Sequence, residues 1–136
     1  MITAVDSNVI LDVVGRDPVF VHASKAAVRE AVSMGGLVAC EAVWAETAGW
    51  FESLEIQASV LGRMGIGFDP MNGSAAHSAG RAWKRYRDAG GERSRMVSDF
   101  LIGAHAQSQA DRLLTRDRGF YRNHFKDLRI IEPSRG

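Results

Sequence analysis

The chain has 136 residues, 46% of them hydrophobic and 24% charged, which suits one compact domain over residues 1–136 with a buried core. Its 17 basic and 16 acidic residues give a formal net charge of +1, so no strong overall field directs the chain to nucleic acid or to a membrane surface. The lone cysteine, the absence of a basic leader and the absence of an apolar run of roughly 20 residues predict a cytoplasmic protein that does not enter a membrane.

The first half of the chain alternates apolar runs with helical segments. Ile2–Val5 is an apolar run that ends at Asp6-Ser7-Asn8, which predicts a buried strand stopping at a polar turn. The next segment is helical in character, and Asp17-Pro18 signals the start of a helix that Gly35-Gly36 ends. A second strand is expected at Leu37–Cys40, followed by a helix from Glu41 to Phe51. That helix is apolar on nearly every side, so we expect it to be buried or covered by a partner.

The second half continues the alternation. A helical stretch around residues 56–61 leads into a third strand within residues 64–68, and Asp69-Pro70 repeats the helix-start signal before an amphipathic helix at residues 73–88. After a basic loop at residues 90–95, the pattern predicts a helix at 97–109, a strand at 112–115, a short helix at 117–121 and a last strand at 128–131. Alternating strands and helices predict an α/β fold: a central, mainly parallel sheet of about five strands flanked by helices.

Four acidic residues are candidates for a site beyond the carboxyl ends of the strands, where open α/β sheets bind ligands. Asp6 follows the first strand and Asp117 follows the fourth, although Asp6 equally suits a polar turn and Asp117 a helix cap. Asp99 suits the first turn of its helix, where an acid interacts favourably with the helix dipole. Glu46 lies among apolar residues that include Trp44, and a carboxylate in such surroundings requires a cation or strong hydrogen bonds.

Taken as a set, the four acids predict a metal site. Carboxylates that converge without compensation repel one another, and a divalent cation supplies that compensation. Carboxylate oxygens suit the hard ions Mg²⁺ and Mn²⁺. Such an ion can activate water and stabilise charge on a phosphodiester.

Four motifs follow one another along the chain: Val5-Asp6-Ser7-Asn8-Val9, Ala45-Glu46-Thr47, Ser98-Asp99-Phe100-Leu101-Ile102-Gly103-Ala104 and Leu113-Leu114-Thr115-Arg116-Asp117. Together they resemble the motifs of the PIN-domain nucleases, and the match spans nearly the whole chain. The chain length and the runs DFLIGAHA and LLTRDRGFY are similar to those of the VapC-type toxins of bacterial toxin-antitoxin pairs.

This resemblance implies a PIN-like α/β sandwich that cleaves RNA endonucleolytically with Mg²⁺ or Mn²⁺ and is inhibited by a cognate antitoxin. It assigns the catalytic and metal-binding roles to Asp6, Glu46, Asp99 and Asp117, and the role of polar supports to Ser7, Asn8 and Thr115. Glu41 is the alternative for the second acid. Gly119 follows Arg118 where the family often has a further acid, so a second metal ion stays open. We also expect a homodimer.

Basic and aromatic residues indicate how the chain meets its partners. RNA affinity is expected to come from phosphate contacts, and the residues predicted to make them are Arg116, Arg118, Arg93 and Arg95. A solvated surface is the alternative for any one of these side chains. Trp44, Trp50 and Phe51 belong either to the core or to a groove for an antitoxin helix. The histidines have no close ligand spacing, which argues against zinc.

Two other functions fit parts of the pattern. An aspartyl-phosphate phosphatase also begins with a strand that ends in an aspartate, but a second acid two residues later normally donates a proton there. Asn8 occupies that position and cannot do so. The other alternative is a non-catalytic module on the same fold that binds RNA or a partner protein.

Overall fold

The central sheet of the computed structural model, which describes residues 1–91 and 97–134, has five parallel strands in the order β3-β2-β1-β4-β5. The strands are β1 (Ile2–Val5), β2 (Gly36–Ala39), β3 (Ile66–Phe68), β4 (Arg112–Leu114) and β5 (Ile130–Ile131). The predicted α/β class and parallel sheet are confirmed, and each strand overlaps the segment in which the sequence predicted it.

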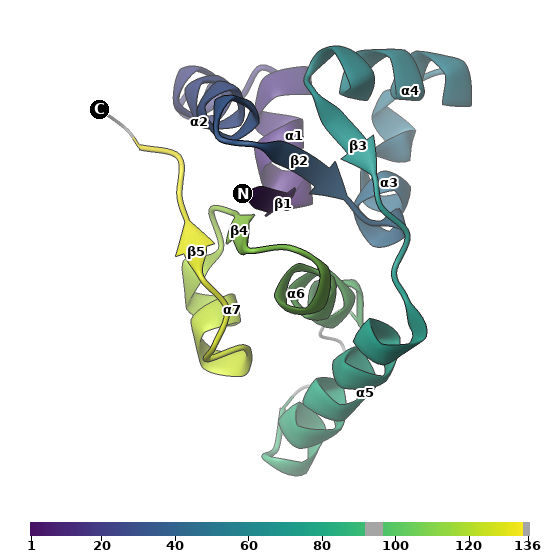
Figure 1. Cartoon of the computed structure of the whole chain (residues 1–136), viewed down its shortest axis with the longest axis vertical. Helices are drawn as coiled ribbons and strands as arrows, with labels where there is room; N and C mark the ends of the chain where they lie inside the picture. The colour runs from purple at the N-terminus through teal and green to yellow at the C-terminus, as the bar shows by residue number, and fades with distance from the viewer. Residues whose placement is uncertain (92–96, 135–136) are drawn as a thin grey trace.

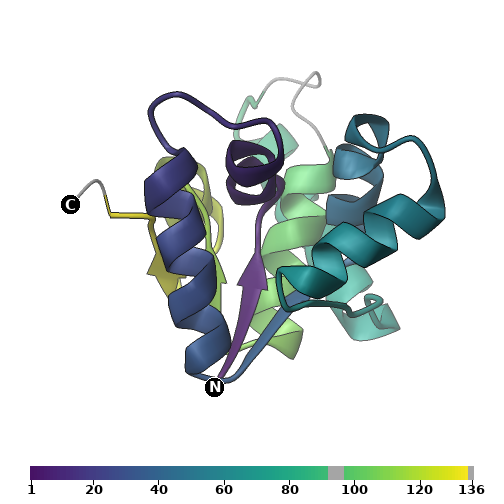
Figure 2. The same cartoon turned by 90° about the horizontal axis from the view of Figure 1, so that it is seen from above.

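Helices cover both faces of this sheet. They are α1 (Ser7–Val14), α2 (Val21–Ser33), α3 (Glu41–Thr47), the 3-10 helix η1 (Ala48–Trp50), α4 (Leu54–Arg63), α5 (Gly73–Asp88), α6 (Val97–Gln109) and α7 (Arg118–His124). Figure 1 shows α1 and α2 on one side of the sheet and α6 on the other, with α5 packed along the outer side of α6. The view from above in Figure 2 shows β1 running between these two helical layers.

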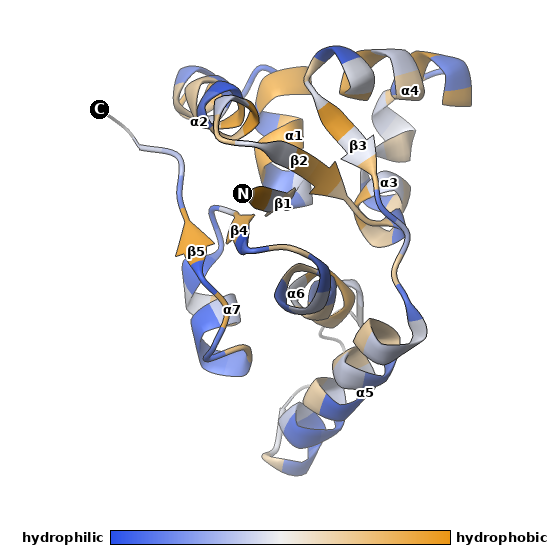
Figure 3. Ribbon diagram, viewed as in Figure 1, coloured by the Kyte–Doolittle hydropathy of each residue, from blue (hydrophilic) through white to orange (hydrophobic). Residues whose placement is uncertain are grey.

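The core lies around β1 and β4, because both strands are covered on both faces. Val5 on β1 and Leu113 and Leu114 on β4 are buried, and Phe100 and Ile102 on α6 pack into the same core. Figure 3 shows the strands as mainly hydrophobic, whereas α5 contains many hydrophilic residues. In the part of the chain that the structure describes, no helix has both the length and the hydrophobicity to cross a membrane.

Both Asp-Pro pairs stand shortly before a helix rather than at its first turn. Asp17 Oδ1 accepts hydrogen bonds from the backbone N–H groups of Val19 and Phe20, both at 2.9 Å, and α2 begins only at Val21. The cap of α5 is Asn72, whose Oδ1 accepts from the N–H of Ala75 at 2.8 Å.

Asp69 therefore does not begin or cap α5, although the proline after it had indicated a helix start. Its Oδ2 lies 2.9 Å from Nε2 of the buried His105 and accepts from Nε2 of Gln109 at 3.1 Å. These bonds tie the end of β3 to α6.

The far end of α5 closes in a Schellman motif. The N–H of Gly91 donates to the carbonyl of Tyr86 at 2.9 Å, and the N–H of Gly90 donates to that of Arg87 at 3.0 Å. Gly90 has φ +87°, a left-handed conformation that glycine adopts without steric cost. The helix consequently stops after Asp88, as the amphipathic pattern predicted.

Candidate active site

The predicted site lies where β1 and β4 end side by side. Val5 pairs with Leu114 across the sheet, and the N–H of Asp6 donates to the carbonyl of Leu114 at 2.9 Å. This register places Asp6 beside Thr115, although 109 positions separate them in the chain. The carboxyl ends of neighbouring parallel strands therefore bring together two of the residues that the sequence selected.

Asp6 is the most constrained carboxylate of the site. Its side chain is buried, and Oδ1 accepts from the N–H of Ser7 at 2.7 Å. Oδ2 accepts from the hydroxyl of Thr115 at 2.7 Å and from the hydroxyl of Tyr121 at 3.0 Å. Asn8 Nδ2 lies 3.4 Å from the same oxygen. The polar supports predicted at Ser7, Asn8 and Thr115 thus surround Asp6.

Burial raises the pKa of Asp6 from 3.8 to about 6, and the nearby negative charge of Asp99 acts in the same direction. The hydrogen bonds from Thr115, Tyr121 and Ser7 oppose this rise. Burial also raises the pKa of Tyr121, as do the charges of Asp6, Asp99 and Asp117. Tyr121 therefore stays protonated and donates, and three of the four predicted acids lie close enough to it to interact electrostatically.

Glu46 joins the network from α3 through hydroxyl groups. Ser7 Oγ donates to Glu46 Oε1 at 2.6 Å, and Ser98 Oγ donates to Oε2 at 3.3 Å. The expected apolar surroundings are wrong, because Glu46 is exposed. α3 buries only one face, with Val43 and Thr47 inside, so the apolar residues nearby in sequence do not enclose the carboxylate.

The remaining predicted acids stand at the starts of two helices. Asp99 is half-buried in the first turn of α6. Asp117 directly precedes α7, but its side chain makes no capping hydrogen bond to that helix, so the cap interpretation fails. The N–H of Asp117 donates instead to Thr115 Oγ1 at 2.9 Å. Thr115 therefore links the backbone of one acid to the carboxylate of another, Asp6.

The described residues do not form a complete set of metal ligands. Among residues 1–91 and 97–134, no three His, Cys, Asp or Glu side chains lie close enough together to hold an ion between them. The alternative second acid, Glu41, points elsewhere, because its carboxylate accepts from the N–H of Met71 at 3.0 Å. What the structure assembles is a carboxylate and hydroxyl network centred on Asp6, with the other predicted acids around it.

The predicted substrate-binding arginines have different surroundings. Arg116 donates from Nε and Nη2 to the buried carboxylate of Asp12, at 2.8 and 2.9 Å. Arg118 is about half exposed, with Nη1 3.9 Å from Glu132. Arg93 and Arg95 lie outside the described residues. Of the two described arginines, Arg118 thus keeps more freedom for a ligand.

Two functional neighbours were missed at the sequence level. Tyr121 was expected only as the end of a short helix, and Asp12 was not singled out at all. Both act through contacts with segments more than a hundred positions away along the chain, Tyr121 with Asp6 and Asp12 with Arg116. The sequence did offer one signal for them. Each is a polar residue on the inward face of a helix that follows β1 or β4, the strands that end at the site.

The apolar cluster divides between core and surface. Trp44 is partly buried and meets Phe68 edge to face, with ring centroids 5.2 Å apart. Trp50 on η1 is 58% exposed, and Leu54 and Ile56 on α4 are also exposed. The segment formed by η1 and the start of α4 therefore presents apolar side chains to solvent.

Comparisons with known proteins agree with this architecture. The chain is similar in structure to a chain of VapBC2 from Rickettsia felis, solved bound to a DNA fragment from their promoter, with a TM-score of 0.74, 16% identity and coverage of 98% of this chain and 100% of that one. For VapBC-1 from nontypeable Haemophilus influenzae the TM-score is 0.69 at 19% identity, covering 97% and 98%. For FitAcB from Neisseria gonorrhoeae the TM-score is 0.66 at 18% identity, covering 98% of each chain.

At these identities the likeness establishes the fold alone, and a comparison with curated proteins finds no match. The PIN domain model, in contrast, matches residues 3–126, which include all four acids of the predicted set. The chain therefore belongs to the PIN-domain family, whose members are generally nucleases.

Proposed function

We propose that the chain is a metal-dependent endoribonuclease and the toxin of a toxin-antitoxin pair. The observation that carries the proposal is the Asp6 carboxylate, which is buried, held by four hydrogen-bond donors and destabilised further by the negative charge of Asp99. A cation offsets both the burial and the repulsion, so a site of this kind gains most from binding one. The family match supports nuclease chemistry, and the likeness to VapBC and FitAcB supports the toxin role.

The donor atoms favour Mg²⁺ or Mn²⁺ over softer metals, because they are carboxylate and hydroxyl oxygens. Mg²⁺ usually keeps several waters and takes only one or two protein carboxylates directly. We assign those contacts to Asp6 and Asp99, and we expect Glu46 and Asp117 to act through water molecules. When bound, a divalent ion supplies activation of water and stabilises charge on the phosphodiester.

The side chains of the chain prepare the reaction around this ion. Thr115 and Tyr121 fix Asp6 through its Oδ2, and Ser7 fixes Glu46 through its Oε1. Glu46 is exposed at the rim of the site, where its carboxylate can orient a water molecule for in-line attack on the phosphorus. No side chain becomes covalently attached to the RNA.

Cleavage of RNA with added Mg²⁺ or Mn²⁺ tests the proposal. We expect Asp6→Asn and Asp99→Asn to lower the cleavage rate by at least about a hundredfold, and a chelator to abolish it. Asp88→Asn is the matched control, because it removes an exposed carboxylate on α5 that pairs only with Lys84 in the described residues. Equal rates for all variants, or cleavage that persists with the chelator, would sink the proposal.

We propose the exposed apolar surface of Trp50, Leu54, Ile56 and Phe68 as the face that an antitoxin covers. Co-expression with the product of a neighbouring gene tests this. Trp50→Ser and Leu54→Ser should release the partner while the purified variants still cleave RNA. Retention of the partner by both variants would place its binding elsewhere. The proposed homodimer is checked on the same samples by sedimentation.

A further inference from the structure

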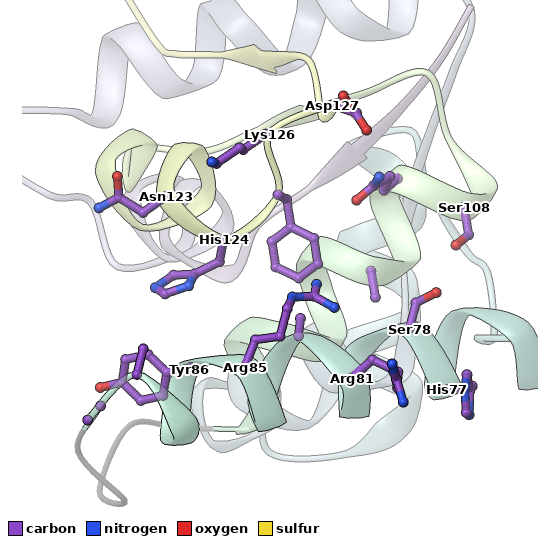
Figure 4. A pocket seen from close by; sticks show the side chains of 17 residues that line it. His77, Ser78, Arg81, Arg85, Tyr86, Ser108, Asn123, His124, Lys126 and Asp127 are labelled. Carbon is purple, nitrogen blue, oxygen red and sulfur yellow. The ribbon is translucent and has the colours of Figure 1, made fainter.

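A basic cleft of about 1290 Å³ lies between α5, α6 and the end of α7, apart from the Asp6 carboxylate. Figure 4 shows Arg81 and Arg85 along the wall formed by α5, with His124 and Lys126 on the opposite wall. Residues of α6 form its base. The hydrogen bonds that hold Asp6 and Glu46 in the described residues come from other side chains and from the backbone of Ser7.

Within residues 1–91 and 97–134, the side chains that line the cleft carry more positive than negative charge. Among the described residues, Arg81, Arg85 and Lys126 form no ion pair, and Asp127 is the one acid that lines the cleft. Cations that outnumber the acids around them are stabilised by a bound anion.

The rest of α5 makes the contrast clear. Outside the cleft, Lys84 pairs with Asp88 at 2.6 Å, and the guanidinium of Arg87 stacks 4.1 Å over the ring of Trp83. Within the described residues, the cations of α5 that have no partner of this kind, Arg81 and Arg85, are those that line the cleft. They lie four positions apart, so their side chains project from one face of the helix on successive turns. Guanidinium groups spaced in this way suit consecutive phosphates of one strand.

Two of the helices that line the cleft begin at the acidic site. α6, which supplies Ala104, Gln107 and Ser108 to the cleft, carries Asp99 in its first turn, and α7 begins directly after Asp117. At one end of the cleft, the rings of Tyr86 and His124 lie 5.5 and 5.3 Å from the ring of Phe100, the residue next to Asp99. A strand cleaved at the acids would thus reach the cations beyond this aromatic cluster.

We propose that this cleft binds the phosphodiester backbone of single-stranded RNA beside the cleaved bond. The inference rests on the proposed function for its ligand, and it deepens that function by naming where the substrate extends. A basic groove that follows one strand binds without base contacts and with strong dependence on salt.

The experiment measures binding separately from cleavage. A fluorescent single-stranded RNA of about 12 nucleotides is titrated with the full chain in a chelator, and its integrity is checked on a denaturing gel. We expect the double variant Arg81→Ala/Arg85→Ala to bind the RNA at least about fivefold more weakly at low salt. The logarithm of the binding constant should also fall less steeply with the logarithm of the salt concentration. The slope should be smaller by about 1.4, because each phosphate that the variant no longer neutralises accounts for about 0.7. Lys126→Ala, from a different element, should lower the slope by about half as much.

The matched control is Lys25→Ala/Arg29→Ala, which removes two exposed cations four positions apart on α2, on the other side of the sheet. It should bind RNA as the unaltered chain does. Unchanged affinity of the cleft variants, an equal weakening in the control, or a change in sedimentation of the cleft variants with RNA binding intact overturns the inference. Stronger binding of a polyglutamate peptide than of RNA by the same cleft also overturns it.

The two proposals fail separately. If the chain binds RNA through the cleft but cleaves none, the nuclease proposal falls and the binding site stands. If it cleaves RNA and the cleft variants bind normally, only the cleft inference falls.

Discussion

Arg116 clamps Asp12 with two hydrogen bonds, from Nε at 2.8 Å and from Nη2 at 2.9 Å. The carboxylate is 2% exposed and also accepts from Ser24 Oγ at 2.6 Å. The guanidinium lies 4.1 Å over the ring of Phe20, and the backbone N–H of Arg116 donates to Asn8 Oδ1 at 3.2 Å. This pair therefore fixes the loop between β4 and Asp117 to α1 and to the segment before α2.

Removing this arginine should destabilise the fold. Of the three side-chain hydrogen bonds to the buried Asp12 carboxylate, Arg116→Ala leaves only the one from Ser24, and we expect the free energy of unfolding to fall by about 2–4 kcal/mol. Arg116→Lys keeps the charge but not the paired geometry, so its effect should be intermediate. Urea denaturation measures all three proteins.

Arg118→Ala is the control two positions away. Its guanidinium is 47% exposed and 3.9 Å from Glu132, so its removal should cost less than about 0.5 kcal/mol. If Arg116→Ala destabilised the chain no more than Arg118→Ala, Arg116 would not be needed to hold Asp12. Only its predicted role in substrate binding would then stand.

Stability should also depend on the protonation of Asp6. Because burial raises its pKa from 3.8 to about 6, the folded chain binds this proton more tightly than the unfolded chain. The resulting stabilisation is complete below about pH 4, decreases as the pH rises towards 6, and is lost above the folded-state pKa. This single group should therefore make the metal-free protein less stable at neutral pH, by on the order of 2 kcal/mol.

Thermal unfolding in a chelator, from about pH 4 to pH 8, measures this contribution. Asp6→Asn cannot titrate, so the difference in melting temperature between variant and unaltered chain should grow in favour of the variant as the pH rises. A difference that stays constant across this range would show that Asp6 is already ionised at the acid end. The hydrogen bond from Lys84 lowers the pKa of the exposed Asp88 from 3.8, so its contribution to stability is lost mainly below about pH 4, and Asp88→Asn should give a nearly constant difference across this range.

The elements of the fold could be predicted well because their signals are local. The α6 segment at residues 97–109 and the α5 segment at 73–88 were predicted with the bounds that the structure has. The start of α2 was less clear, because a turn separates Asp17-Pro18 from Val21, and Asp69-Pro70 likewise precedes α5 without capping it. Asp69 shows why: its carboxylate binds His105 and Gln109, which are distant in sequence.

The site was predictable in composition but not in contacts. Parallel strands carry Asp6 and Thr115 to the same edge, as expected from their order along the chain. The exposure of Glu46 was harder to predict, since Val43 faces inward on α3 while the carboxylate three positions later faces out. Tyr121 and Asp12 could not be identified as partners because their contacts depend on the packing of α7 and α1 against other segments.

The hydroxyl of Tyr121 should tune metal binding. It lowers the pKa of Asp6 through its hydrogen bond, so Tyr121→Phe should leave less ionised carboxylate near neutral pH. We expect Mn²⁺ affinity, measured by calorimetry, to fall by about tenfold or more, and the deficit to shrink as the pH is raised. Ser33→Ala removes a hydroxyl at the end of α2 that bonds only the carbonyl of Glu30 in the described residues, and should bind Mn²⁺ normally. If Tyr121→Phe bound Mn²⁺ as tightly as the unaltered chain at every pH, this hydroxyl would have no part in metal binding.

Two glycines within helices should respond oppositely to the same substitution. Gly103 on α6 lies directly under the ring of the buried Phe125, and a Cβ added there would come 2.6 Å from Cδ2 of that ring. Gly103→Ala forces α6 and the end of α7 apart, so unfolding should become easier by about 1–3 kcal/mol. Gly80 on α5 has no atom within 4 Å of an added Cβ. Gly80→Ala should therefore stabilise the chain by about 0.5–1 kcal/mol, through helix propensity and the lower entropy of the unfolded state.

Denaturation of both variants side by side distinguishes packing from propensity, since propensity alone predicts that both substitutions stabilise. Destabilisation by both would show instead that α5 has no room at Gly80.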